Sequence, residues 1–226
     1  MEVGDVEKDG KIRSKERIKK FLSFIKEYEE KSRYDFIMLS YSEIDSYIYN
    51  IGEIKENFIK DCGELVSLGF DGVHIDIEPV RLEQRGDYLD LLKRFAVEFP
   101  ENKILSVYSG AVGSDYSDNE WEWPLGFYEE AARNVDLIFV PGYDLGLNDE
   151  RRYRRAIEKQ IGKLSSIEYS HLILGVPTHK QEPETIENAL EAFSIAGQQK
   201  NQFIGVAIFA EWTIDKSEWK IFEEYL

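Results

Sequence analysis

The stretch GFDGVHIDIEPV, Gly69 to Val80, reads as a buried strand that carries ionisable groups on one face. Successive residues of a strand point to opposite faces. The odd-numbered positions of its centre hold valine and isoleucine, whereas His74, Asp76 and Glu78 occupy the even-numbered positions. The neighbouring candidate strands are apolar on both faces, which favours a sheet covered on both sides. A pair of carboxylates in such a sheet needs a chemical role.

Length and charge narrow the class of protein. The 226 residues have an ordinary globular composition and are long enough for one substantial core, so we expect a single domain over residues 1–226. The formal charge of −16 argues against nucleic acid or an anionic membrane as partner, because both reward clustered lysine and arginine. A neutral or weakly charged substrate fits better.

The N-terminus and the single cysteine bear on location. MEVGDVEKDG lacks the basic and apolar regions of a signal peptide, and no apolar run approaches the roughly 20 residues of a membrane span. As written, the chain is expected to be cytoplasmic; an extracellular or cell-surface location is expected only if an N-terminal segment is missing. Cys62 is the only cysteine, lies in a helical pattern and is expected to be a buried thiol.

Strand and helix patterns alternate along the chain, which is the signature of a parallel sheet built from βα units. The strand-like runs are Phe36–Tyr41, Gly72–Ile77, Ile104–Tyr108, Leu137–Val140, Leu172–Val176 and Phe203–Phe209. The helical patterns are Lys15–Glu30, Ile54–Leu68, Tyr88–Glu98, Phe127–Arg133, Tyr153–Leu164, Thr185–Ala196 and Ser217–Tyr225, with Ser217 as a candidate cap of the last.

A repeat near 30 residues fits a doubly wound sheet or a (β/α)₈ barrel. No glycine-rich phosphate loop follows the first predicted strand, which weakens the nucleotide-binding alternative. Polar and aromatic residues instead collect at the carboxyl ends of several strands, where barrels of this class assemble their active sites. These residues are Ser42 and Glu43, Asp76 and Glu78, Tyr108 and Ser109, Tyr143 and Asp144, Thr178 and His179, and Glu211 and Trp212.

The barrel does not close from this pattern, because about six βα units are found where eight are required. The simplest interpretation is a (β/α)₈ TIM-barrel type domain that lacks its first two strands, with EVGDVEKDGKI as the loop after the second. The alternative is a compact variant, or a partner chain that supplies closure.

Asp76 and Glu78 lie on one strand face, with Cα atoms roughly 6.6 Å apart at ~3.3 Å per residue. Two close carboxylates do not both ionise readily, so one keeps a proton toward neutral pH, as a general acid must. Pro79 ends the strand and leaves Glu78 at its mouth. We therefore assign Glu78 as the proton donor and Asp76 as its modulator.

FDGVHIDIEPV resembles the DGxDxDxE signature of glycoside hydrolase family 18, the chitinase-like (β/α)₈ hydrolases. The resemblance implies that Glu78 is the general acid and base, that the N-acetyl group of the substrate is the nucleophile, and that Asp76 orients that group. The sequence shows no residues for a required metal or organic cofactor, and none is expected. His74 departs from the pattern, because the family has an aspartate there. A protonated His74 would hold Asp76 as a carboxylate; the alternative is an interior histidine without a catalytic part.

Three later segments also resemble the family, in the same order along the chain. DLIFVPGYDLG is similar to the strand that ends MxYD, which implies that Tyr143 contacts the acetamido carbonyl and Asp144 the sugar. LILGVPTHK and GVAIFAEW are similar to the seventh and eighth strands. By local spacing Phe209 replaces the tryptophan that forms the floor under the scissile sugar, and Trp212 is a second candidate for that contact.

Other candidates rest on position alone. Tyr41 and Tyr108 are candidate substrate-binding residues at strand ends. Trp121 and Trp123 could line a sugar subsite or pack their own loop. For Thr178, His179 and Glu211 a structural role is the better interpretation, and Asp144 could equally be a turn residue.

Three functions fit these residues. The first is a hydrolase of β-linked N-acetylhexosamine glycans, chitin-like or peptidoglycan-like, that acts with retention by substrate assistance. The second is a catalytically silent glycan-binding protein on the same fold. The third is a glycosidase that uses two carboxylates directly, drawn from Glu43, Glu78 and Glu211. The expected partner is an oligo- or polysaccharide, and the sequence does not give an oligomeric state.

Overall fold

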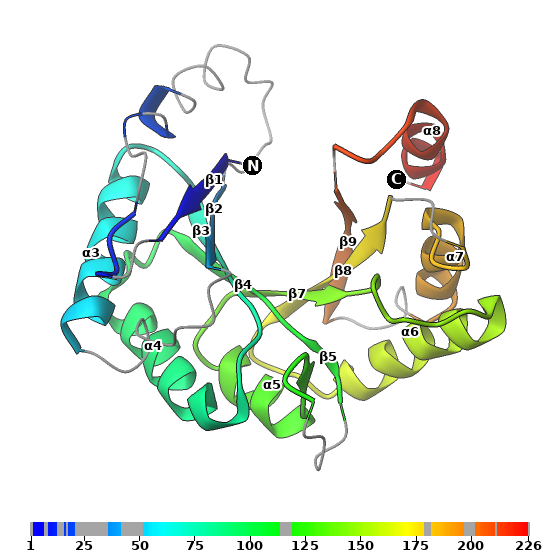
Figure 1. Ribbon diagram of the computed structural model, residues 1–226, viewed down its shortest axis with the longest axis horizontal. Coiled ribbons are helices and arrows are strands. Elements are labelled where there is room, and N and C mark those ends of the chain that lie inside the picture. The colour runs from blue at the N-terminus through cyan, green and yellow to red at the C-terminus, as the bar shows by residue number, and fades with distance from the viewer. Residues whose placement is uncertain are drawn as a thin grey trace. The chain divides into compact units, whose positions relative to one another are not determined.

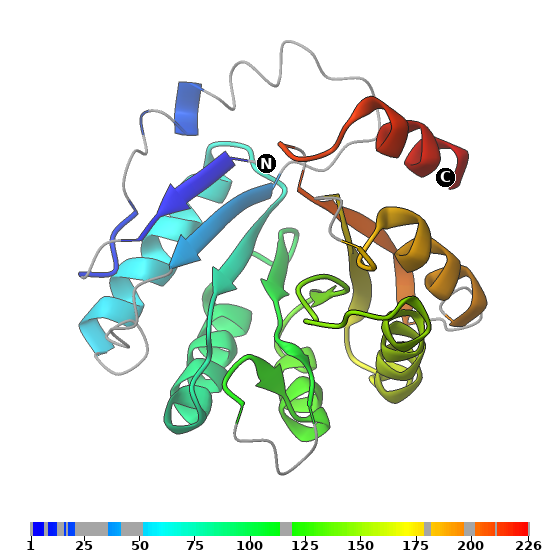
Figure 2. The same cartoon turned by 45° about the vertical axis from the view of Figure 1, so that its right-hand side comes forward.

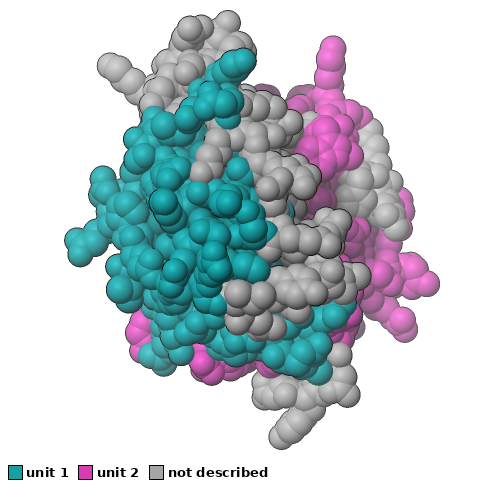
Figure 3. All heavy atoms as spheres, turned by 60° about the vertical axis from the view of Figure 1, so that its left-hand side comes forward, with its two compact units in different colours: residues 1–108, 133–137 teal, residues 109–132, 138–226 magenta. Residues whose placement is uncertain are grey.

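The computed structural model describes residues 2–6, 9–12, 16, 18–20, 36–41, 52–113, 119–178, 182–196, 202–210 and 212–225. These residues form two compact units, which Figure 3 shows in different colours. Unit 1 comprises residues 1–108 and 133–137, and unit 2 comprises residues 109–132 and 138–226. Each unit combines parallel strands with helices (Figures 1 and 2).

The described part of unit 1 contains four parallel strands in the order β1-β2-β3-β4. Their bounds are Glu2–Asp5 for β1, Phe36–Tyr41 for β2, Gly72–Ile77 for β3 and Ile104–Tyr108 for β4. Helices of this unit with described bounds are α3 (Gly52–Ser67) and α4 (Arg85–Glu98), with the 3-10 turn η1 (Leu82–Gln84) between them. Figures 1 and 2 show α3 and α4 on the same side of these strands.

The helices of unit 1 pack through aromatic edges. Phe95 of α4 lies edge-on against Phe58 of α3, with ring centroids 5.5 Å apart, and against Phe99, at 5.9 Å. All three rings are buried. Cys62 is fully buried in α3, which confirms the buried thiol predicted from the sequence. The buried Lys55 amine donates to Asp90 at 2.6 Å and joins α3 to α4 at their margin.

Strand β1 corrects one sequence interpretation. The segment EVGD was assigned to a loop, yet it pairs in parallel with β2, Glu2 opposite Ile37 and Asp5 opposite Ser40. The chain therefore has one more strand ahead of those predicted. Four residues with acidic ends and a central glycine carry no apolar alternation, so the pattern gave no strand signal.

Unit 2 begins with two short paired strands, β5 (Ala111–Val112) and β6 (Glu122–Trp123), followed by α5 (Leu125–Ala132). Three longer strands follow in the order β7-β8-β9. Their bounds, with the helices between them, are Leu137–Pro141 for β7, Glu150–Leu164 for α6, His171–Pro177 for β8, Ile186–Ala196 for α7, Phe203–Phe209 for β9 and Lys216–Tyr225 for α8. The six predicted strands are thereby confirmed within one residue at each end.

Aspartates cap two helices of unit 2. The Asp149 carboxylate accepts from the backbone N–H of Arg152 at 2.9 Å at the start of α6. Asp215 accepts from the N–H groups of Ser217 and Glu218, and Glu218 accepts from the N–H of Asp215 at 2.9 Å. This reciprocal arrangement is a capping box. The cap of α8 is therefore Asp215, and the prediction of Ser217 was wrong by two residues.

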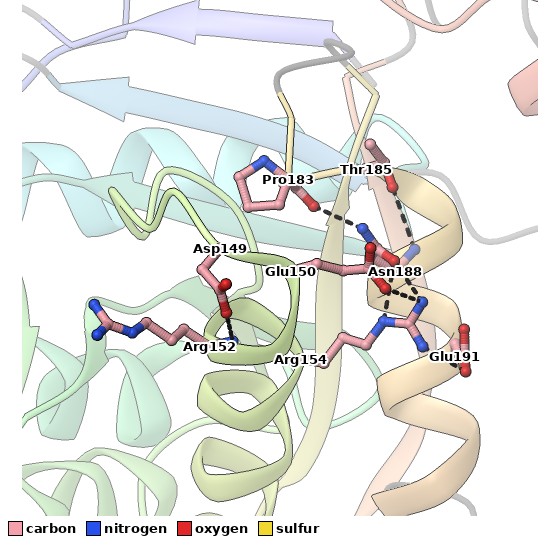
Figure 4. Close-up of polar contacts among 8 residues, drawn as sticks. All are labelled: Asp149, Glu150, Arg152, Arg154, Pro183, Thr185, Asn188 and Glu191. Carbon is pink, nitrogen blue, oxygen red and sulfur yellow. Dashed lines mark hydrogen bonds and ion pairs between the residues drawn. The ribbon is translucent and has the colours of Figure 1, made fainter.

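A polar cluster joins α6 to α7 (Figure 4). The Asn188 carbonyl of α7 accepts two bonds from the Arg154 guanidinium, at 3.0 and 2.8 Å, while its amide donates to the Pro183 carbonyl at 2.9 Å. Arg154 also pairs with Glu150 on its own helix and with Glu191 of α7. Asn188 thus ties α6, α7 and the loop before α7 together. None of the helices in the described ranges is long and apolar enough to cross a membrane.

Asn188→Ala should lower the free energy of unfolding by about 1–3 kcal/mol, because the variant removes the buried amide that accepts from the Arg154 guanidinium and donates to the Pro183 carbonyl. Urea unfolding followed by tryptophan fluorescence measures the change. Ser166→Ala is the control, since it removes only an exposed local bond to the Lys163 carbonyl. Equal unfolding curves for the two variants would contradict a structural role for the cluster.

Candidate active site

The carboxylate strand β3 is hydrogen-bonded on both sides, to β2 and to β4. Its register places Asp76 opposite Ser40 and His74 opposite Ser106. Residues Gly72 to Ile75 are buried, whereas Asp76 and Glu78 are half-buried. Glu78 follows the last residue of the strand. The two acids therefore lie at the carboxyl end of a rigid element and keep access to solvent, as a proton-transferring pair requires.

His74 is a buried ring held by a neighbouring strand. It is 4% exposed, and its Nδ1 lies 2.9 Å from the Ser106 hydroxyl of β4. The Ser106 hydroxyl also lies 3.3 Å from the Val73 carbonyl, to which it can donate. Because a hydroxyl carries one proton, the choice between these two acceptors sets the tautomer of His74. Ser106 was not singled out from the sequence, since only the strand register brings it opposite His74.

Burial lowers the pKa of His74 from 6.5 to about 4, because the charged ring would lose its hydration. The ring is therefore neutral near pH 7. A protonated His74 that holds Asp76 as a carboxylate was one of the two roles considered from the sequence. A neutral ring cannot play this role near pH 7. A neutral imidazole can still donate or accept a hydrogen bond on the face that it shares with Asp76.

Three aromatic side chains gather in unit 2 at the ends of β7 and β9. The Tyr143 ring stacks on Phe209, with centroids 4.1 Å apart and planes 7° from parallel. The Trp212 ring packs edge-on against Phe209, with ring centroids 6.0 Å apart. Exposure rises along the group, from 7% for Tyr143 through 39% for Phe209 to 68% for Trp212. The structure thus brings together three residues that the sequence had predicted separately.

Glycines make room for Tyr143. A Cβ atom at Gly175 of β8 would lie 2.8 Å from the Tyr143 Cε1 atom, closer than side chains approach. A Cβ at Gly142 would lie 2.5 Å from the Gly175 carbonyl oxygen. Glycine at position 175 therefore lets the Tyr143 ring pack against β8, and glycine at position 142 lets the backbone before Tyr143 approach the β8 backbone.

Asp144 is the third residue of the loop that follows β7. It is exposed and has a φ of 54°, in the left-handed region that aspartate tolerates better than most residues. Gly146, two residues later, has a φ of 67°. This backbone supports the turn alternative for Asp144, and its contact with a sugar stays a prediction.

The remaining candidates divide by environment. Thr178 is fully buried, donates to the Ala210 carbonyl at 2.8 Å and lies 2.8 Å from the Thr213 hydroxyl, which supports its structural interpretation. Trp123 packs edge-on against Phe127 at 4.7 Å. It therefore packs its own loop, whereas Trp121 is 55% exposed.

The last candidates stay predictions. Tyr108 is half-buried at the end of β4, and Tyr41 ends β2 with a side chain outside the described part. Ser42, Glu43, His179 and Glu211 lie outside the described residues. Among the residues that the structure describes, no group of three or more histidine, cysteine, aspartate or glutamate side chains is placed to hold a metal ion.

Solved structures share this fold. The spore cortex-lytic enzyme SleL of Bacillus megaterium superimposes with a TM-score of 0.72 at 14% identity, over 99% of this chain and 66% of that enzyme. A chitinase from Chromobacterium violaceum gives a TM-score of 0.71 at 9% identity, over 100% of this chain and 90% of that chitinase. Human YKL-39, described as a pseudo-chitinase with retained chitooligosaccharide binding, gives a TM-score of 0.55 at 16% identity. The match covers 78% of this chain and 57% of YKL-39.

These likenesses fix the fold. The chain has the TIM-barrel type α/β fold of the chitinase-like, glycoside hydrolase family 18 proteins, which confirms the fold class inferred from the sequence. It spans 66% of the B. megaterium enzyme and 43% of the SleL enzyme of Bacillus cereus. No protein-family model matches the sequence, and neither does any curated protein sequence.

The buried His74 should make stability depend on pH. Its folded pKa lies below its unfolded value, so the unfolded chain binds the proton first and stability falls as pH drops from about 6.5 toward 4. A change from pH 7 to pH 5 should therefore lower the free energy of unfolding by about 2 kcal/mol through His74 alone. Urea unfolding of the parent and His74→Asn at both pH values measures this. The exposed His171→Asn is the control, and an unchanged pH dependence in His74→Asn would refute the buried neutral ring.

Proposed function

We propose that this chain is a glycoside hydrolase of family 18 that cleaves β-linked N-acetylhexosamine glycans, chitin-like or peptidoglycan-like, with retention of configuration. The observation that carries the proposal is the pair Asp76 and Glu78 at the carboxyl end of a paired parallel strand, on a chitinase-like fold. The names of the neighbours, chitinases and spore cortex-lytic enzymes, support glycan cleavage.

In the proposed reaction Glu78 gives its proton to the glycosidic oxygen as the bond to the anomeric carbon breaks. The carbonyl oxygen of the substrate's own acetamido group attacks that carbon and forms an oxazolinium-like intermediate. The Glu78 carboxylate then takes a proton from water, which opens the intermediate from the side of the departed group and retains the configuration. Asp76, on the same strand face, orients the acetamido group and supports its developing positive charge.

The aromatic group of unit 2 supplies the proposed sugar contacts. Phe209 and Trp212 present exposed ring surface, on which the apolar face of a pyranose can stack. The hydroxyl of Tyr143 donates to the acetamido carbonyl, and Asp144 accepts from a sugar hydroxyl. His74 supports the carboxylate strand from its buried position rather than from the surface, because its ring is covered and bonded to Ser106.

A catalytically silent glycan-binding protein is the second candidate. Human YKL-39 is described as a pseudo-chitinase that binds chitooligosaccharides, and it shares the fold. In this chain, histidine replaces the first inner aspartate of the family signature, which favours this candidate, whereas the terminal acid Glu78 favours the hydrolase. A two-carboxylate glycosidase would need Glu43 or Glu211 as the partner of Glu78, and both lie outside the described residues.

Glu78→Gln should lower hydrolysis of aryl N-acetyl-β-glucosaminides and chitooligosaccharides by about 10²- to 10⁴-fold, because the amide cannot donate the proton. Chromophore release and product chromatography measure the rate, and calorimetry measures oligosaccharide binding, which should survive. Glu83→Gln, the same change at an exposed residue of η1, is the matched control.

Equal rates in the parent and Glu78→Gln would contradict the role of Glu78. Oligosaccharide binding by a parent that releases no product would instead support the silent glycan-binding protein.

A further inference from the structure

Two buried polar side chains of α6 reach the end of β7. The Tyr153 hydroxyl donates to the Gly142 carbonyl at 2.5 Å, and the Gln160 amide donates to the Pro141 carbonyl at 2.7 Å. Tyr153 is fully buried and Gln160 is 6% exposed. Both carbonyls belong to the two residues that immediately precede Tyr143.

The bond from Tyr153 acts on the peptide that leads into Tyr143. The Gly142 carbonyl belongs to the planar peptide unit that ends at the Tyr143 Cα, so holding this oxygen fixes the plane from which the Tyr143 side chain departs. On its other side Gly142 donates its N–H to the Gly175 carbonyl at 2.9 Å. The backbone before Tyr143 is therefore held on both sides, by α6 and by β8.

The Tyr143 ring is held as well. One edge lies against Gly175, where any side chain would collide with it, and one face lies against Phe209. Ring and backbone thus have few alternative placements. Pre-set geometry of this kind matters most at a group that must meet a reacting atom.

Gln160 makes a second contact in the same unit. Its carbonyl oxygen accepts from the Val112 N–H of β5 at 2.8 Å, and Lys163, one turn later on α6, donates to the Gly113 carbonyl at 3.1 Å. One amide side chain thus bridges β5 and β7, with both of its ends satisfied.

These polar groups are unusual for the face that they occupy. The buried face of α6 otherwise consists of Ile157, Ile161 and Leu164. A buried hydroxyl or amide costs free energy unless it is hydrogen-bonded, and an aliphatic residue would fill the same space without that requirement. Tyrosine and glutamine therefore occupy these positions because of what they bind.

We propose that Tyr153 and Gln160 are positioning residues that hold Tyr143 in the orientation needed to contact the substrate. This inference rests on the proposed function, in which the Tyr143 hydroxyl meets the acetamido carbonyl. Under this proposal α6, a helix that carries no predicted site residue, contributes to the recognition of N-acetyl sugars by orienting Tyr143.

Tyr153→Phe removes one hydroxyl and tests the proposal. It should lower kcat/KM for chitooligosaccharides by roughly 10- to 100-fold, because Tyr143 loses its orientation. The matched control is Tyr128→Phe, which removes another fully buried hydroxyl that donates to a glycine carbonyl, that of Gly110, in the same unit. Both variants should lower the melting temperature, but Tyr128→Phe should keep kcat/KM within about threefold.

A double-mutant cycle with Tyr143→Phe separates positioning from general loss of stability. If Tyr153 acts through the Tyr143 hydroxyl, adding Tyr153→Phe to Tyr143→Phe lowers kcat/KM no further, although the melting temperature still falls. The proposal would be overturned if the fold-losses in kcat/KM of the two single variants multiplied in the double variant. Equal losses of kcat/KM in Tyr128→Phe and Tyr153→Phe would also overturn it.

A spectroscopic readout keeps this inference separate from the proposed hydrolysis. The Tyr143 ring protons, assigned by their absence in Tyr143→Phe, should carry a ring-current shift from Phe209. That shift should change in Tyr153→Phe and stay in Tyr128→Phe. A shift that is unchanged in Tyr153→Phe would overturn the positioning role even in an active enzyme, whereas an inactive parent would count against the proposed function alone.

Discussion

The hydrogen-bonded register of β3 between β2 and β4 is the constraint on which the carboxylate site depends. Because side chains alternate along a strand, a slip of one residue would move His74, Asp76 and Glu78 to the opposite face together. Pairing on both sides prevents that slip. The same register brings Ser106 opposite His74, which gives the buried ring a hydrogen-bond partner, while burial lowers its pKa and keeps it neutral near pH 7. Placement of the acids and the electrostatics behind them thus follow from one set of backbone bonds.

The aromatic group of unit 2 follows a related logic. Phe209 ends β9, and Tyr143 and Trp212 lie two and three residues beyond the ends of β7 and β9. Side chains in such places can reach a ligand at the carboxyl edge of a parallel sheet. Exposure increases from Tyr143 to Trp212, so Phe209 and Trp212 present apolar ring surface while the Tyr143 ring is largely buried. Glycine at position 175 and two polar residues of α6 fix the buried end of this group. The aromatic rings that could contact a sugar therefore lie near the strand ends, while Gly175 and α6 hold the backbone and ring of Tyr143 in place.

The sequence predicted the strands well and the supporting contacts poorly, for physical reasons. Alternating or continuous apolar runs such as Gly72–Ile77 and Phe203–Phe209 identify strands directly, whereas the polar EVGD of β1 becomes a strand only by pairing with β2. Tyr143 and Phe209 were predicted as separate site residues, but their stacking depends on tertiary structure. Ser106, Tyr153 and Gln160 carry no motif, because each acts across a gap of many residues that only the fold closes.

The proposal that the substrate's acetamido group is the nucleophile is tested most directly by comparing matched aryl β-glycosides that differ only at carbon 2, one with an acetamido group and one with a hydroxyl. The account predicts hydrolysis of the acetamido compound with retained anomeric configuration, read by proton NMR of the first-formed product, and no turnover of the hydroxyl compound. Comparable turnover of both, or a covalent glycosyl-protein adduct trapped by mass spectrometry, would contradict it.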